Sequence, residues 1–82
     1  MYYIYLLKNA QGKLYIGYSK DLRRRIKEHH LGKTYTTRRM GETKLIYYEA
    51  YEDEYAAKER EKKLKQFGSS YKGLIKRLKI KT

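Results

Sequence analysis

Residues 2–18 read YYIYLLKNAQGKLYIGY and carry the clearest structural signal of the chain. Residues that favour β-strands, among them tyrosine, isoleucine and leucine, cluster at both of its ends. The middle, residues 9–12, is polar and contains two turn formers, Asn9 and Gly12. The pattern predicts a β-hairpin whose strands cover residues 2–8 and 13–18.

Two tyrosines of this hairpin, Tyr5 and Tyr15, lie ten residues apart on its facing strands. Neighbouring side chains on one face of such a pair are close enough to interact. We therefore expect the two hydroxyl groups to converge on one spot. Because tyrosine is common in strands for packing reasons, the hairpin alone also fits two aromatic residues without a chemical role.

The rest of the chain carries signals for one further strand and three helices. The predicted elements are a helix that follows capping residues 19–21 and ends at residue 31, a loop over 33–42, a strand over 44–51, a helix over 52–66 and an amphipathic helix over 71–78. The predicted fold is therefore α+β, a small three-stranded antiparallel sheet flanked by helices in the order β-β-α-β-α-α.

The length of 82 residues fits a single domain over residues 1–82. The chain has no cysteine, so it has no disulfide or thiolate metal site, and we expect a cytoplasmic location. The uncharged run over residues 1–7 is too short for a signal peptide or a membrane span, so no membrane partner is expected.

Positive charge dominates the composition, with 21 Lys and Arg against 9 Asp and Glu, a formal net charge of +12. Such an excess favours nucleic acid as the partner, through contacts with phosphates. An anionic membrane surface fits less well, because no strongly apolar face accompanies the basic one. Charge alone does not separate an enzyme from a binding protein.

The helix after the hairpin presents two polar residues at the edge of its predicted buried face. Leu22 and Ile26 mark that face. Arg25 and His29 lie four residues apart along one edge of it, whereas Arg24 turns away. From the helix alone, Arg25 also fits a surface arginine, and His29 an ordinary, partly buried histidine.

On the next helix, Glu61 lies between two core candidates, Ala57 and Leu64, and leans toward the interior. A carboxylate in that position is costly unless it is paired or holds a cation. Glu61 is therefore the best candidate metal ligand, and an ion pair with Arg25 or Arg60 is the equal alternative.

Together these residues resemble the pattern of the GIY-YIG nuclease superfamily. Within it, the chain is similar to the small single-domain branch that includes catalytic subunits of structure-specific junction endonucleases. The matching positions are Tyr5, Tyr15, Arg25, His29 and Glu61. The glycine that opens the first motif of the family is Tyr3 here.

The resemblance implies a metal-dependent DNA endonuclease that hydrolyses phosphodiester bonds, and the similar branch points to structure specificity in DNA repair or recombination. Glu61 would hold one divalent cation, Mg²⁺ or alternatively Mn²⁺. Arg25 would bind the scissile phosphate, and Tyr5 would orient the phosphate or the nucleophile. The general base would be Tyr15 or His29, and the residues leave this choice open.

Basic residues of the loop, Lys33, Arg38 and Arg39, are predicted to contact the nucleic acid. The expected substrate is DNA, with branched, nicked and single-stranded forms all open, and the sequence does not separate DNA from RNA. Two alternatives remain at this point: a nucleic-acid-binding protein without catalysis, and a nuclease subunit that is active only with a protein partner.

Overall fold

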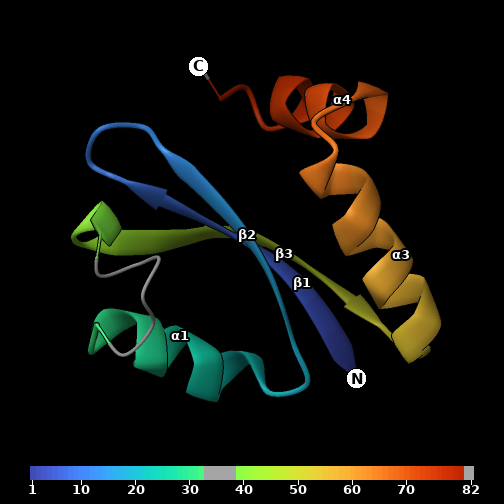
Figure 1. Ribbon diagram of the computed structural model, residues 1–82, viewed down its shortest axis with the longest axis horizontal. Helices are drawn as coiled ribbons and strands as arrows, with labels where there is room; N and C mark the ends of the chain where they lie inside the picture. Colours follow the sequence, from blue (N-terminus) through green and yellow to red (C-terminus); the bar gives the residue numbers. More distant parts are fainter. Residues whose placement is uncertain (33–38, 81–82) are drawn as a thin grey trace.

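The computed structural model describes residues 1–32 and 39–80. Its elements are β1 (Tyr2–Asn9), β2 (Leu14–Ser19), α1 (Leu22–His30), β3 (Thr43–Tyr51), α3 (Glu54–Lys65) and α4 (Ser69–Arg77) (Figure 1). The strands form one antiparallel sheet in the order β2-β1-β3. The predicted α+β fold and its order β-β-α-β-α-α are confirmed.

The hairpin turn is built by Asn9. Its side-chain oxygen accepts hydrogen bonds from the backbone N–H groups of Gln11 at 3.0 Å and Lys13 at 2.8 Å. Gly12 has a φ of +86°, in the left-handed region that favours glycine. Asn9 also donates from Nδ2 to the carbonyl of Met40 at 3.0 Å, which ties the turn to the segment before β3.

The hairpin register sorts side chains between the two faces of the sheet. Tyr5 lies opposite Gly17, and Leu7 lies opposite Tyr15. Because side chains alternate along a strand, these four residues share one face, and the even-numbered residues between them share the other. Tyr5 and Tyr15 therefore lie on one face of the sheet, and the aliphatic core residues Ile4, Leu6 and Ile16 lie on the other.

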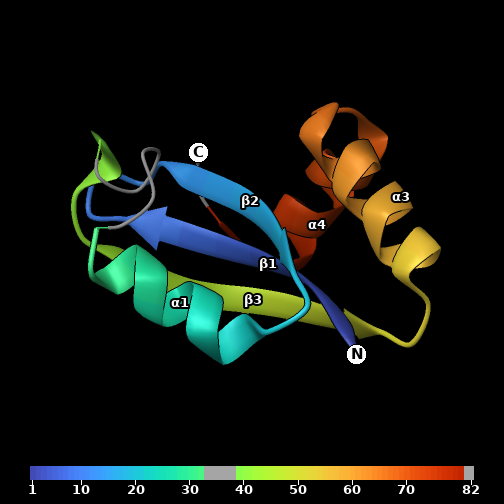
Figure 2. The same ribbon diagram turned by 60° about the horizontal axis from the view of Figure 1, so that its bottom comes forward.

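The helices cover both faces of the sheet (Figures 1 and 2). The two views agree that α1 lies on one side, and that α3 and α4 lie on the other. The main core lies under α3 and α4 and consists of Ile4, Leu6, Ile16, Ala57, Leu64 and Leu74. Ala57 and Leu64 were the predicted core residues of α3, and both are fully buried.

Capping carboxylates mark the starts of two helices. Asp21 accepts from the backbone N–H of Arg24 at 3.1 Å, and Asp53 accepts from that of Ala56 at 3.1 Å. Consequently α1 begins where the sequence predicted, and α3 begins two residues later than predicted. The last helix, α4, begins at Ser69, two residues before the predicted start.

One expectation for α1 needs correction. Leu22 and Ile26 were predicted to mark its buried face, but both are only half-buried, and His29 is the buried residue of this helix. The rings of Tyr5 and Tyr15 pack against His29 in the last turn of α1, so the burial of this helix is concentrated there. Among the described residues, no helix is long and apolar enough to cross a membrane.

Candidate active site

A hydrogen bond between β1 and α1 forms the centre of the candidate site. The hydroxyl oxygen of Tyr5 lies 2.7 Å from Nε2 of His29. Both side chains are buried, with 1% of Tyr5 and 3% of His29 exposed. Tyr5 comes from the middle of β1 and His29 from the last turn of α1. This contact therefore brings together two residues that the sequence predicted separately.

Tyr15 of β2 completes the group, here called the tyrosine–histidine cluster (Tyr5, Tyr15 and His29). Its ring centroid lies 6.2 Å from that of Tyr5 and 5.3 Å from that of His29. In the hairpin register the two tyrosines are diagonal neighbours on one face. The rings lie side by side, as the hairpin pattern predicted.

Burial sets the protonation states in this cluster. It raises the pKa of the Tyr5 hydroxyl above its ordinary value; Tyr15 adds to this effect and Arg25 opposes it. Burial, together with the positive charge of Arg25, lowers the pKa of His29 below its ordinary value of 6.5. Tyr5 is therefore a neutral hydroxyl at neutral pH and His29 a neutral imidazole, so Tyr5 can donate to Nε2 of His29.

Gly17 makes room for the Tyr5 ring, a role that the sequence analysis did not assign. It lies directly opposite Tyr5. A Cβ atom at this position would collide with Cζ and the hydroxyl oxygen of Tyr5. The sequence signal for this role is the register of the hairpin. Pairing of the Tyr3-Ile4-Tyr5 segment with the Tyr15-Ile16-Gly17 segment places Gly17 opposite Tyr5.

Arg25 lies beside the cluster on α1. Its Nη1 donates to Oε1 of Glu28 at 3.2 Å, and 43% of the arginine side chain is exposed. The arginine also influences the pKa of both Tyr5 and His29, so its charge reaches the cluster. Arg25 is therefore a cation at the edge of the cluster with access to solvent.

Glu61 lies on α3, which covers the other side of the sheet from α1 (Figure 2). Its carboxylate pairs with Lys65, one turn later, at 3.0 Å, and 22% of its side chain is exposed. The two arginines that the sequence offered as its ion-pair partners, Arg25 and Arg60, both pair with other carboxylates. The role of Glu61 as a metal ligand stays a prediction.

The charge of Glu61 nevertheless reaches the edge strand β2. Burial and a 2.6 Å hydrogen bond to Glu54 raise the pKa of Tyr18 to about 12, with a smaller contribution from Glu61. Tyr18 and Tyr15 come from the same strand but from its opposite faces. The charge of Glu61 thus acts on a residue of the strand that also carries Tyr15.

The residues present fit a metal ion that takes few ligands from the protein. Within residues 1–32 and 39–80, no group of three or more His, Asp or Glu side chains could hold a metal. Mg²⁺ typically binds one or two carboxylates and fills its other positions with water and substrate phosphate. A half-buried carboxylate such as Glu61, whose lysine partner is exposed, suits that mode of binding.

A second polar network fixes α3 on the sheet. Glu49 of β3 accepts from Nε and Nη2 of Arg60, each at 3.0 Å, and from the hydroxyl groups of Tyr47 and Tyr51. These hydrogen bonds outweigh the effect of burial and lower the pKa of Glu49. Because Arg60 precedes Glu61, the network also sets the rotation of α3 that orients Glu61.

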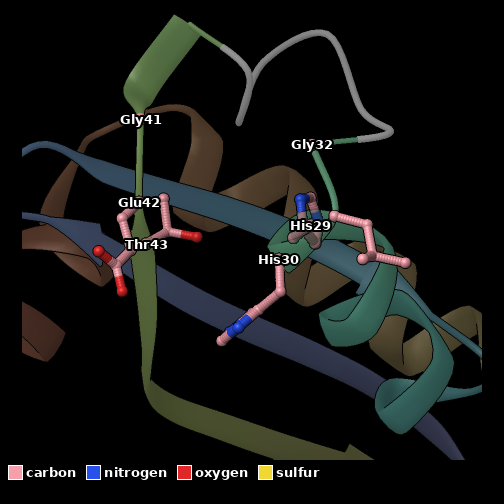
Figure 3. Close-up of a pocket in the computed structure, with 7 residues that line it drawn as sticks. His29, His30, Gly32, Gly41, Glu42 and Thr43 are labelled. Atoms are coloured by element: carbon pink, nitrogen blue, oxygen red, sulfur yellow. The ribbon is translucent and has the colours of Figure 1, made fainter.

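A pocket of about 420 Å³ borders the cluster at the end of α1. Figure 3 shows His29 and His30 on one side of this pocket, and Glu42 and Thr43 on the other. His29 is thus shared between the cluster and the pocket.

The basic residues predicted to contact nucleic acid are only partly described. Lys33 and Arg38 lie outside the described residues. Arg39 is exposed and precedes Met40, whose carbonyl oxygen binds the hairpin turn. Arg39 therefore lies at the same end of the sheet as the turn.

Comparison with known proteins gives the family. Residues 1–74 match the GIY-YIG catalytic domain. A UPF0213 protein of Clostridium perfringens is 38% identical over 74 residues, which cover 88% of this chain and 78% of the relative. A UPF0213 protein of Staphylococcus saprophyticus is 37% identical over 73 residues, which cover 87% of this chain and 88% of the relative.

A solved structure agrees with this match. The solution NMR structure of a UPF0213 protein of Bacillus halodurans is similar to this chain with a TM-score of 0.59 and 33% identity. The similarity covers 98% of this chain and 87% of that protein. With a family match over nearly its whole length, the chain belongs to the GIY-YIG family.

Proposed function

We propose that this protein is a metal-dependent endonuclease that hydrolyses phosphodiester bonds of DNA. The observation that carries the proposal is the 2.7 Å contact between the Tyr5 hydroxyl and Nε2 of His29, with Tyr15 and Arg25 beside it. It places a buried, neutral hydrogen-bonding pair next to a solvent-accessible cation. Phosphodiester hydrolysis needs both an oriented nucleophile and neutralisation of the charge on the phosphate.

Arg25 would bind the scissile phosphate. Its present partner, Glu28, is a surface carboxylate with 32% of its side chain exposed, so the pair is weak and a phosphate can replace it. In this position the guanidinium would face the phosphate and still lie near Tyr5 and His29.

Tyr15 would position the attacking water or accept its proton. His29 is the alternative base, but its Nε2 already binds the Tyr5 hydroxyl, which favours Tyr15 as the residue that faces the water. Tyr5 would then orient the phosphate or the nucleophile, and His29 would hold the hydroxyl of Tyr5 in place.

Glu61 would hold the divalent cation, Mg²⁺ or Mn²⁺, at the β2 edge. When bound, such a cation neutralises phosphate charge and lowers the pKa of a bound water. The net charge of +12 supports a polyanionic substrate. The proposal further includes action on branched, nicked or single-stranded DNA in repair or recombination. It also includes a protein partner and a cytoplasmic location.

The test incubates the pure protein with labelled branched, nicked, duplex and single-stranded DNA, with Mg²⁺, with Mn²⁺ and with a chelator. We expect cleavage of at least one substrate that the chelator abolishes. Glu61→Gln should abolish cleavage and leave folding and most DNA binding intact, because a neutral amide is a poor ligand for Mg²⁺. Binding without cleavage under all conditions would favour a protein that only binds nucleic acid.

Two neighbouring arginines provide a matched control. Arg24 is exposed on α1, whereas Arg25 reaches the cluster. Arg25→Ala should therefore lower the cleavage rate far more than Arg24→Ala. Equal losses would indicate a diffuse basic surface and would contradict the role proposed for Arg25.

A further inference from the structure

An exposed tyrosine of β3 lies next to the tyrosine–histidine cluster. Tyr48 is the direct cross-strand partner of Tyr5. Directly opposed residues point to the same face of a sheet and lie about 5 Å apart. Tyr48 therefore shares the face of the cluster, but 53% of it is exposed whereas Tyr5 is buried.

Tyr3 supports the ring of Tyr48. The two ring centroids lie 6.2 Å apart with an angle of 61° between the planes, an edge-to-face pair. The strand partner of Tyr3 is Ala50, a small and exposed residue. The ring of Tyr48 is thus supported on one side by Tyr3, while the small Ala50 leaves room near the pair.

The two tyrosines line a shallow cleft of about 460 Å³ that also contains basic groups. Lys20 and Arg23 line the same cleft, and both are exposed. The one carboxylate there, Asp21, caps α1 by accepting from a backbone N–H group. Lys20 also pairs with Glu54 of α3 at 3.7 Å, an exposed ion pair that a phosphate can replace. The cleft therefore combines an aromatic surface with two exposed cations.

We propose that Tyr48 is a stacking surface for an unpaired base next to the scissile phosphate. An exposed aromatic ring with cations beside it is how proteins bind unpaired nucleotides, because every base has a face that can stack. Within a duplex, both faces of a base are covered by its neighbours. The protein would therefore prefer DNA that presents an unpaired nucleotide near the site of cleavage.

The geometry places this base close to the reacting phosphate. Tyr48 lies directly opposite Tyr5, and directly opposed residues of an antiparallel pair are about 5 Å apart. The stacked base would therefore belong to a nucleotide next to the phosphate at Tyr5, a position that rests on the proposed function.

The test measures the affinity of the full chain for DNA in the presence of a chelator, with a fluorescent single-stranded oligonucleotide and with a blunt duplex of the same sequence. Tyr48→Ala should weaken binding of the single strand between about 5-fold and 100-fold, the range that base–aromatic stacking provides. Binding of the duplex should change by less than about 2-fold, because only the two terminal pairs of a duplex expose a base face.

Two further variants control for folding and for loss of any tyrosine. Tyr48→Phe keeps the ring and should bind the single strand within about 2-fold of the wild type. Tyr55 on α3 is 72% exposed on another part of the surface, and Tyr55→Ala should leave both affinities unchanged. Unchanged binding by Tyr48→Ala, or an equal loss for single strand and duplex, would overturn the proposal.

Cleavage is scored separately with Mg²⁺. If the wild type cleaves no substrate but Tyr48→Ala selectively loses the single strand, the stacking surface stands and the nuclease proposal fails. If the wild type cleaves and Tyr48→Ala binds both DNAs normally, the nuclease proposal stands and the stacking surface fails.

Discussion

Replacement of Gly17 by alanine tests the packing that holds Tyr5 in place. The backbone of Gly17 lies outside the left-handed region, so alanine is compatible with its conformation. The added Cβ would collide with Cζ and the hydroxyl oxygen of Tyr5, a ring that is only 1% exposed. The ring must therefore move, and its hydrogen bond to His29 must lengthen or break.

Two opposing effects determine the change in stability. Overpacking of a well-packed site costs about 1–3 kcal/mol. Replacement of glycine inside a strand recovers about 0.5–1 kcal/mol of conformational entropy. We therefore expect a net loss of about 1–2 kcal/mol, or a Tm roughly 5–15 °C lower for a domain of this size. Cleavage should fall by about a hundredfold, as for a catalytic group displaced by about 1 Å.

Thermal unfolding and single-turnover cleavage would measure these effects, with Gly73→Ala as the control. Gly73 lies inside α4, and a Cβ there meets no atom within 4 Å, so this variant should gain about 0.5–1 kcal/mol of stability. In a Tyr5→Leu background the cost of Gly17→Ala should shrink, because the shorter side chain removes the collision. A Gly17→Ala protein as stable and active as the wild type would show that Tyr5 does not depend on the space left by Gly17.

Three other variants test other contacts of the site. Tyr15→Phe keeps the ring packing but deletes the hydroxyl, so we expect unchanged stability and a loss of about a hundredfold in single-turnover cleavage; equal rates would leave His29 as the base. Glu28→Gln should leave stability within about 0.5 kcal/mol and tighten DNA binding, measured by fluorescence anisotropy, because it frees Arg25 from a weak surface pair; weaker binding would contradict this. Glu49→Gln should cost about 2–3 kcal/mol at neutral pH in urea unfolding, because Arg60 loses its partner in a largely buried pair. The pKa of Glu49 is lowered from 4.5, so its contribution is complete above pH 4.5 and disappears as the pH falls through the lower value in the folded protein; a difference between wild type and variant that does not shrink in acid would contradict this assignment.

Local signals in the sequence were sufficient to predict the element order. Asn9 and Gly12 specify the hairpin turn. Asp21 and Asp53 cap the first turns of α1 and α3 and so mark where these helices begin. Each of these effects acts within four residues, so it can be recognised without knowledge of the fold.

The partners of long side chains could not be predicted in the same way. Arg60 reaches Glu49 on another element, and Glu61 pairs with Lys65 rather than with either arginine. Exposed ion pairs within a helix differ by only a few tenths of a kcal/mol, so sequence spacing does not choose among them. The burial of His29 likewise depends on the rings of Tyr5 and Tyr15 beneath α1. The helical periodicity of the sequence does not show which side chains of the sheet will lie there.

The alternation of side chains along β1 and β2 places the main core on one face of the sheet and the tyrosine–histidine cluster on the other. Residues that point toward α3 and α4 include Ile4, Leu6 and Ile16 of the main core, whereas those that point toward α1 include Tyr5, Tyr15 and Gly17. Because a strand has a period of two, a shift of one residue in the pairing of β1 with β2 would exchange these faces. The same aliphatic residues that stabilise the sheet therefore also fix the register on which the tyrosine–histidine cluster depends. Gly17 adds a second constraint, since only in this register does the position without a side chain face the ring of Tyr5.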